Sequence, residues 1–351
     1  MDRMVLFVMR GHRAKTSAAI GACRNLALVF VAMGPWPLDP RGPEAQEIVG
    51  LYWIMFVAAM IVLAIVAGAI IYAGIRFRDR PGHVAQQFHG HNMLELTWTV
   101  IPTVMVISFS VLSWNRLNFI NDVDTNAAMT IRVQAQQWSW AFTYPDQPMF
   151  KLSDGTALQA GGQLDIPAGQ KIKIELTSKD VIHSFWVPNL GGKKDAVPGH
   201  TTSLWIQANE PGTFRGQCYE FCGDGHADML LTVVAHAQND YATWAKSAID
   251  DANRAIDPRT KVGRDTFLAS ACVGCHTVKG TSAAGKVGPE LTHIASKPNI
   301  AGVLSPVNQE NLTKWVSDAP SIKPGVVMPR FKGTLSDQQI NDIVQWLLTL
   351  K

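Results

Sequence analysis

The sequence predicts a multidomain membrane protein, in which a two-helix transmembrane hairpin carries a small β-domain and a C-terminal all-α domain. Three observations support this prediction. Two long apolar stretches lie between residues 51 and 116, polar and apolar residues alternate between 128 and 236, and helical periodicity returns beyond Lys261. The composition agrees, because 47% of the residues are hydrophobic and only 17% are charged, which is a low charge content for a soluble protein.

Residues 1–35 have the features of a secretory signal peptide. A basic segment precedes a short apolar run from Leu26 to Met33, and small residues and a proline follow. We expect cleavage near residues 34–36. Lipidation of Cys23 is an alternative, although no clean apolar run precedes that cysteine.

The transmembrane region is expected over residues 36–120, with helices at about 51–75 and 94–116. A helix needs about 20 apolar residues to cross a bilayer, and a buried helix of a soluble protein is the alternative for each stretch. Arginines between the two spans place their loop in the cytoplasm: Arg76, Arg78 and Arg80. Both termini are therefore expected outside, on the periplasmic side of a bacterial inner (plasma) membrane.

The β-domain is expected over residues 128–236. Polar and apolar side chains alternate from Lys171 to Leu176, and turn signals such as Pro167-Ala168-Gly169 separate the β-rich runs. This pattern predicts a small antiparallel sandwich or barrel.

The rest of the chain is expected to be helical. Residues 237–260 are polar and alanine-rich, which favours a helical tail and linker. In the domain at 261–351, helices are expected at Gly263–Ala271 and Ser336–Thr349. Ser336 and Gln339 have the spacing of a capping box at the start of the second helix.

Two thiols, an imidazole and a thioether lie within one short segment of the β-domain: Cys218, Cys222, His226 and Met229. Soft thiolate and thioether ligands favour copper, and imidazole also binds it. A mononuclear blue-copper site needs one cysteine, whereas two cysteines four positions apart can bridge two ions. His183, on an earlier β-rich run, is a candidate for a second imidazole. A disulfide, a zinc site and the cysteine pair of a copper chaperone are the alternatives.

The C-terminal domain contains Cys272-Val273-Gly274-Cys275-His276, which has the spacing of a c-type haem attachment site. Cys272 and Cys275 would form the thioethers and His276 would bind the iron. Met328 is the only methionine in this domain and the natural sixth ligand, since a methionine ligand raises the haem potential. His293 is a rival for that position, and a zinc or redox site is the alternative for the cysteines.

The distribution of charge suggests how the two domains interact. Residues 128–236 contain eight basic and ten acidic groups, whereas residues 261–351 contain ten basic and six acidic groups. Opposite net charges favour docking of the C-terminal domain on the β-domain. The net charge of the whole chain, +3, is too small to indicate a nucleic-acid partner.

The ligand segments resemble those of cytochrome c oxidase subunit II, the copper-carrying subunit of a respiratory-chain terminal oxidase. Asp180–Phe185 and Lys194–Gly199 look like the family's first ligand loop, and Cys218–Met229 matches its second, Cys-x-Glu-x-Cys-x-x-x-His-x-x-Met. The resemblance implies a cupredoxin-like Greek-key β-barrel that holds a dinuclear copper centre, CuA. Its implied ligands are bridging Cys218 and Cys222, His183, His226, Met229 and the carbonyl of Glu220.

The resemblance also implies roles for three further residues. The Glu220 side chain would bind magnesium at the interface with subunit I. Glu95 would lie at the mouth of a proton-uptake path into subunit I. Trp138 matches the tryptophan that accepts electrons from cytochrome c, although Ser139 stands where the family usually has tyrosine. A solvated Glu220, a plain interfacial Glu95 and a core Trp138 are the alternatives.

Residues 261–351 resemble a class I cytochrome c, so the chain looks like an oxidase subunit II that carries its own haem c. The implied function is electron transport from a cytochrome c-type donor, through haem c and CuA, to subunit I. That partner, assembled with subunit III in the lipid membrane, reduces oxygen to water and pumps protons, which makes the complex a translocase. A nitric oxide reductase subunit and a stand-alone membrane electron carrier remain alternatives. A quinol oxidase subunit is disfavoured, because that relative lacks the copper ligands.

Overall fold

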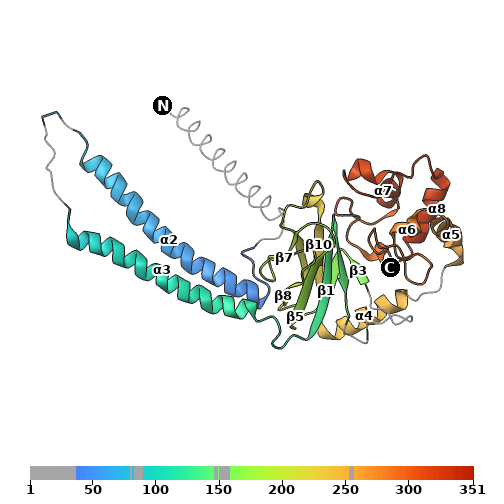
Figure 1. Ribbon diagram of the computed structural model, residues 1–351, viewed down its shortest axis with the longest axis horizontal. Helices are drawn as coiled ribbons and strands as arrows, with labels where there is room; N and C mark the ends of the chain where they lie inside the picture. The colour runs from blue at the N-terminus through green and yellow to red at the C-terminus, as the bar shows by residue number, and fades with distance from the viewer. Residues whose placement is uncertain (1–36, 80, 83–89, 146–148, 150–158, 253–256) are drawn as a thin grey trace, which may run out of the picture.

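The computed structural model describes most of the chain after its N-terminal segment: residues 37–79, 81–82, 90–145, 149, 159–252 and 257–351. Three parts follow one another in space, namely a helical hairpin, the β-domain and the C-terminal domain (Figure 1). The predicted signal peptide, its cleavage position and Cys23 lie outside the described residues.

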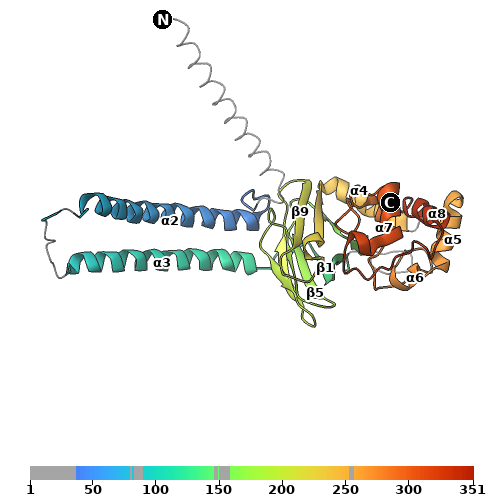
Figure 2. The same cartoon turned by 90° about the horizontal axis from the view of Figure 1, so that it is seen from above.

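Two long helices form the hairpin and run side by side away from the β-domain (Figure 2). Helix α2 spans Pro43–Arg76 and α3 spans Asn92–Asn121, so both extend beyond the predicted apolar cores. Pro43 suits the first position of α2, where no backbone N–H is needed. The apolar segments of both helices are exposed in the isolated chain, as expected for surfaces that meet lipid or other membrane helices.

The base of the hairpin is fixed to the β-domain through backbone contacts. A Cβ on Gly42, directly before α2, would lie 2.1 Å from the carbonyl oxygen of Gln207. Glu44 in the first turn is buried and accepts a 2.8 Å hydrogen bond from the Gly192 amide. The Trp205 indole donates to the carbonyl at the end of α3, 2.8 Å away. These contacts set the direction in which the β-domain faces relative to the membrane helices.

The β-domain consists of two five-stranded sheets packed face to face. The first has the order β3-β2-β1-β5-β8, with β1 at Met129–Gln136, β2 at Ser139–Thr143, β3 at Gln159–Gly161, β5 at Ile172–Ser178 and β8 at Thr202–Ile206. The second has the order β4-β10-β9-β6-β7, with β4 at Gln163–Pro167, β6 at His183–Trp186, β7 at Lys194–Ala196, β9 at Gly212–Cys218 and β10 at Leu230–His236.

The expectation of a purely antiparallel domain is wrong for two strand pairs. Strand β1 pairs in parallel with β5, and β4 pairs in parallel with β10. The turn at Ala168-Gly169 carries the chain from β4 in one sheet to β5 in the other. The consecutive strands β4 and β5 therefore belong to different sheets, and each pairs in parallel with a strand that is distant in the sequence, β10 and β1 respectively.

The predicted alternation in β5 is confirmed, because every second residue from Ile172 to Ser178 is buried between the sheets. The same two-residue period lets inward side chains fill the space between two sheets. The largest core side chains are aromatic and come from both sheets: Trp140, Phe142, Tyr144 and Phe185. Helix α4 (Gln238–Ala252) continues from β10 and packs on this core with Tyr241 and Ala245.

The C-terminal domain is helical, as predicted. It comprises α5 at Lys261–Ala269, α6 at Cys272–Cys275, α7 at Gln309–Ile322 and α8 at Asp337–Leu347, with a short 3-10 turn at Ile294–Ser296 (η4). Two other 3-10 turns lie before this domain, at His226–Asp228 (η2) between β9 and β10 and at Pro258–Thr260 (η3) directly before α5. The Ser336–Gln339 capping box is confirmed. Helices α5 and α8 cross closely, since a Cβ on Gly263 would lie 1.9 Å from the Asp342 carbonyl oxygen.

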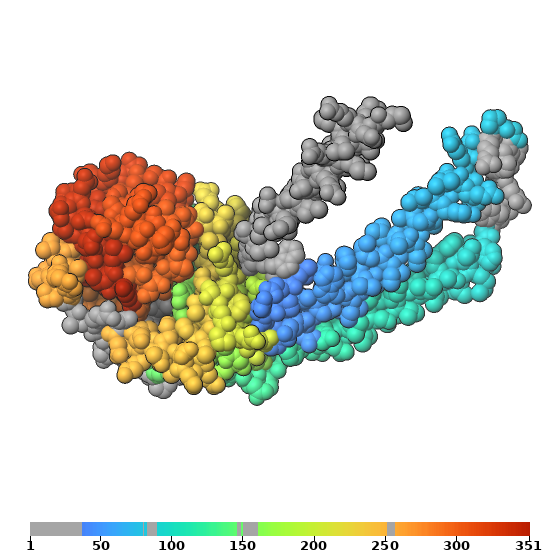
Figure 3. All heavy atoms as spheres, turned by 180° about the vertical axis from the view of Figure 1, so that it is seen from behind, coloured from blue at the N-terminus to red at the C-terminus, as the bar shows by residue number. Residues whose placement is uncertain are grey.

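The C-terminal domain rests on the β-domain at the side away from the hairpin (Figure 3). Gln136 and Lys179 of the β-domain donate to the carbonyl oxygens of Val287 and Lys286, at 3.0 and 3.1 Å. The expected docking is therefore present. These two contacts join side chains to backbone carbonyls. Attraction of Lys297 to Asp165 and of Lys323 to Asp228 adds opposite charges across the same interface.

Candidate copper and haem sites

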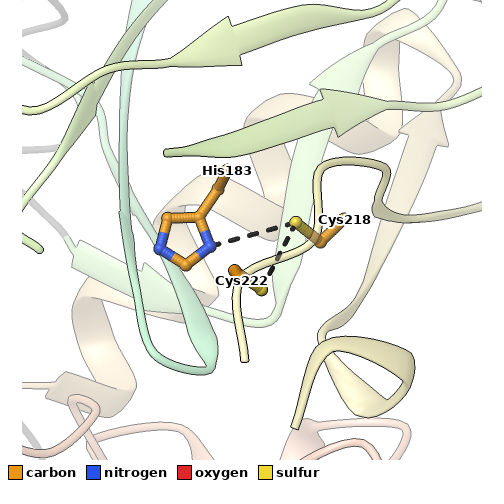
Figure 4. A group of neighbouring side chains, drawn as sticks. All are labelled: His183, Cys218 and Cys222. Carbon is orange, nitrogen blue, oxygen red and sulfur yellow. Dashed lines mark hydrogen bonds between the residues drawn. The ribbon is translucent and has the colours of Figure 1, made fainter. Parts of the chain in front are cut away.

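The two sulfurs of the predicted copper site face one imidazole inside the β-domain (Figure 4). His183 begins β6, Cys218 ends β9, and Cys222 follows in the next loop. The sulfurs lie 3.8 Å apart, and Nδ1 of His183 lies 3.9 Å from the sulfur of Cys218. Both cysteines are free, and 3.8 Å is far beyond the S–S bond length of about 2.05 Å. The disulfide alternative is therefore not what the structure contains.

The remaining predicted donors complete a ring around the cysteines. Nδ1 of His226 and Sδ of Met229 lie 3.5 and 3.9 Å from the sulfur of Cys222, and the Glu220 carbonyl lies 3.2 Å from the sulfur of Cys218. Atoms that each bind a metal ion at about 2.0–2.3 Å are spaced in this way around it. The chemistry of the set, with two thiols, two imidazoles and a thioether, fits copper.

The loop that carries these donors, Cys218–Met229, is the copper loop. Its ends are tied together by a 2.9 Å hydrogen bond from the Cys218 amide to the Met229 carbonyl. The Tyr219 amide donates to the Ser184 carbonyl on β6 at 3.0 Å, and Phe185 pairs with Cys218 across β6 and β9. Pairing of the two strands therefore brings the distant His183 to the cysteines.

Asp180 orients His183, a role that we did not predict from the sequence. Its Oδ1 lies 2.9 Å from Nε2 of His183, which turns Nδ1 toward the sulfur of Cys218. The carboxylate also accepts backbone hydrogen bonds from Gln137 and Val181, both at 2.7 Å. Metal-binding histidines commonly donate their second nitrogen to a carboxylate, so an aspartate three residues before His183 was the available signal.

The two thiols have different electrostatic environments. Burial raises the pKa of Cys218, but hydrogen bonds with His183 and the backbone outweigh burial, so its pKa is lower than usual. Burial and the neighbouring Cys218 raise the pKa of Cys222 to about 12. Metal binding requires thiolates, so loading the site releases the protons that the two thiols carry.

The C-terminal domain brings the predicted haem-binding residues to the ends of its short helices. Cys272 and Cys275 bound α6, and His276 follows directly. Nδ1 of His276 lies 2.8 Å from the Pro289 carbonyl, which leaves Nε2 available for iron. Burial lowers the pKa of His276, despite this backbone hydrogen bond, so the ring is kept in the neutral form that binds metals.

Met328 and its rival His293 occupy different environments. Met328 follows α7 and packs, partly buried, on the core of the C-terminal domain. His293 is buried and its Nε2 lies 2.8 Å from the Ala248 carbonyl on α4. This contact occupies Nε2, one of the two ring nitrogens of His293, and Met328 stays the predicted sixth ligand. The donor set of the domain, with two thiols, a histidine and a methionine, fits haem c.

Comparison with known proteins places these sites in one family. Residues 38–115 match the family "Cytochrome C oxidase subunit II, transmembrane domain", 129–236 match "Cytochrome C oxidase subunit II, periplasmic domain", and 261–351 match "Cytochrome c". A "Cytochrome c oxidase subunit 2" of Alkalihalophilus pseudofirmus is 35% identical, with 90% of each chain covered. The chain belongs to the cytochrome c oxidase subunit II family.

Two further proteins are similar to parts of this subunit II. A "Cytochrome c oxidase subunit 2" of Bacillus subtilis is 30% identical, and 80% of this chain and 82% of the relative are covered. The solved periplasmic domain of cytochrome oxidase subunit II of Bradyrhizobium japonicum is 29% identical, covering 35% of this chain and 94% of that one, with a TM-score of 0.32. The chain is thus a membrane-anchored subunit of a haem–copper oxidase, with a cupredoxin-like copper domain and a cytochrome c domain.

Trp138 of this subunit II lies between the copper loop and the C-terminal domain. Its indole N–H donates to the Cys222 carbonyl at 2.9 Å. A Cβ on Gly225 would lie 2.5 Å from one part of the ring, and a Cβ on Gly325 of the C-terminal domain would lie 2.7 Å from Cη2 at the opposite edge. Trp140 is the core residue of this segment instead, because it is 1% exposed.

The two predicted glutamates are far from each other. Glu220 is exposed on the copper loop, with its side chain free of the cage that its carbonyl faces. Glu95 is exposed in the first turn of α3, and that end of the hairpin lies farthest from the β-domain (Figure 1). The structure therefore separates the position predicted for proton uptake from the copper site by the length of the hairpin.

Proposed function

We propose that this subunit passes electrons from a cytochrome c-type donor, through its own haem c and CuA, to subunit I, where oxygen is reduced to water with proton pumping. The observation that carries the proposal is the position of Trp138. Its indole is hydrogen-bonded to the carbonyl of Cys222 and contacts Gly325, three residues before Met328. One side chain therefore connects the copper loop with the segment that carries the sixth haem ligand.

For the copper site, we propose that Cys218 and Cys222 bridge two ions, which His183 and His226 cap. Met229 and the Glu220 carbonyl complete the ligand set. All five ligand side chains are held in place by β6, β9 and the closed copper loop, and His183 is fully buried. A rigid cage keeps the ligands in place when the charge of the site changes. Bound copper and haem would supply reversible one-electron redox chemistry.

For the haem site, we propose thioether bonds to Cys272 and Cys275, and iron ligation by His276 and Met328. The segment around Pro289, which orients His276, and the segment before Met328 both contact the β-domain. The copper domain therefore receives electrons from the C-terminal domain of the same chain. Since Gly325 packs on the indole, we propose that an external donor docks on the C-terminal domain rather than at Trp138.

The surface of the copper loop supports contact with subunit I. Phe221 is 78% exposed, and Val181 and Ile182 beside His183 are 39% and 45% exposed. Exposed apolar groups that gather around a site mark protein interfaces. We propose that the side chain of Glu220, next to Phe221, shares a magnesium ion with this partner. We propose Glu95 as the mouth of a proton-uptake path at the cytoplasmic side, and subunit III as a further partner.

The proposed domain limits are 36–120 for the hairpin, 128–236 for the copper domain, 237–260 for the linker and 261–351 for the cytochrome c domain. We propose that both termini lie on the periplasmic side, which the arginines at the other end of the hairpin support, and that residues 1–35 are cleaved as a signal peptide. Protease accessibility in sealed spheroplasts tests this orientation.

One experiment tests the proposal as a whole. The complex is purified through a tag on this chain, its optical spectrum is recorded, and consumption of oxygen and of nitric oxide is measured with reduced cytochrome c. We expect a covalent haem c, a co-purifying haem–copper subunit and oxygen consumption. Absence of that subunit would refute the oxidase proposal, and turnover of nitric oxide without oxygen turnover would identify a reductase instead.

A further inference from the structure

A buried lysine crosses the interface between the C-terminal domain and the copper loop. Lys323, directly after α7, is 2% exposed. Its ammonium donates to the Ala301 carbonyl at 2.7 Å within its own domain and to the Asp228 carbonyl at 3.2 Å on the copper loop. A buried charge is unfavourable unless hydrogen bonds compensate it, so these two carbonyls determine where the side chain can be accommodated.

Gly302 packs against the same carbonyl of the copper loop, that of Asp228. A Cβ on Gly302 would lie 2.0 Å from the Asp228 oxygen, and the residue has a φ of +80°, which favours glycine. Lys323 and Gly302 therefore contact one backbone atom, and that atom belongs to the residue before Met229. Gly325, two residues after Lys323, packs on Trp138. These contacts form one continuous patch beside the copper ligands.

The charges around Lys323 agree with a binding contact. Burial lowers its pKa to about 8, while attraction to Asp228 opposes that change. The carboxylate that attracts Lys323 thus comes from the copper loop. The contact joins the segment of Met328 to the segment of Met229, so it links a proposed haem ligand to a proposed copper ligand through short stretches of backbone.

We propose that Lys323 is a positioning residue that holds the C-terminal domain docked on the copper loop. Electron transfer from haem to copper then starts from a preformed complex rather than from a search by a tethered domain. This inference rests on the proposed function. A tether alone gives a high effective concentration but no fixed orientation, and the buried Lys323 contact supplies the orientation.

The test uses the complete oxidase with Lys323→Met, which retains much of the side-chain volume and loses the hydrogen bonds. Transfer from haem to copper is followed in a single turnover after rapid photoreduction, with and without glycerol. In the wild-type complex we expect a rate that does not depend on viscosity. In the variant we expect a rate at least tenfold lower that falls further with viscosity. Lys332→Met, at an exposed lysine of the same domain, is the matched control and should behave as wild type.

Each outcome either supports or overturns the positioning role of Lys323. A wild-type rate in Lys323→Met, or a lower rate that glycerol does not change, overturns the positioning role. If Lys323→Met fails to incorporate haem, Gly302→Ala perturbs the same carbonyl from the neighbouring segment, and a normal rate there overturns the proposal. If the wild-type complex itself transfers no electrons from haem to copper, the proposed function fails instead.

Discussion

The contact of Trp138 with both domains leads to a quantitative prediction. Trp138→Phe removes the hydrogen bond to the Cys222 carbonyl and withdraws the ring edge from Gly325. The hydrogen bond to Cys222 lies within the β-domain and holds the ring in place, so only the contact with Gly325 enters the docking equilibrium directly. Loss of the packed ring edge costs about 1 kcal/mol, which corresponds to about fivefold in that equilibrium. We expect the rate of haem-to-copper transfer to fall by as much as this factor.

The measurement is single-turnover electron transfer within the purified complex, read from the haem absorbance. Trp186→Phe is a matched control, because the Trp186 indole also donates one hydrogen bond to a carbonyl, that of Gly191 at 2.8 Å. Trp186 belongs to β6 and packs on Tyr219. Equal rates in the two variants would refute the idea that Trp138 connects the sites, since both changes remove the same chemical group.

Three further predictions concern the metal sites and their pH dependence. Cys222→Ser should abolish copper binding, because a hydroxyl does not bridge two soft ions; copper analysis should show the loss while the haem spectrum persists. Met328→Ala should lower the haem midpoint potential in a redox titration, whereas His293→Ala should leave it unchanged. Burial raises the pKa of Glu290 to about 7 from its usual 4.5, so the folded state holds this proton more tightly and loses stability as pH rises from 4.5 to 7. Thermal unfolding should show a loss of about 1–2 kcal/mol from this group after solvent screening. Glu290→Gln should reduce the pH dependence of the unfolding free energy without removing it, because burial also raises the pKa of Glu44 to about 7. The same pH dependence in both proteins would contradict the prediction.

Several features could be predicted because they depend on residues close together in the chain. The copper loop places its donors within twelve consecutive positions, and the haem attachment site occupies five. The capping box of Ser336 and Gln339 is equally local and is confirmed. Hydrophobic length alone indicated two spanning helices, although it did not show that α2 begins at Pro43 under the β-domain.

Other features depend on contacts that the sequence does not encode locally. The parallel pairing of β1 with β5 follows from a change of sheet at one turn, which composition does not reveal. The contact of His293 with the Ala248 carbonyl, which bears on its rivalry with Met328 as a haem ligand, joins residues far apart in the chain. Asp180 was visible in the sequence only as a neighbour of His183, and its role required the distance to the imidazole.

The sequence by itself determined the three-part architecture and the chemistry of both metal sites, because residue type and short spacing are sufficient to specify ligands and membrane spans. Only the tertiary structure showed how the C-terminal domain meets the copper loop. That contact joins Lys323 and Gly302 to the carbonyl of Asp228, and Gly325 to Trp138. Every residue has a backbone carbonyl, so a contact made through carbonyls leaves no pattern of residue types from which it can be predicted.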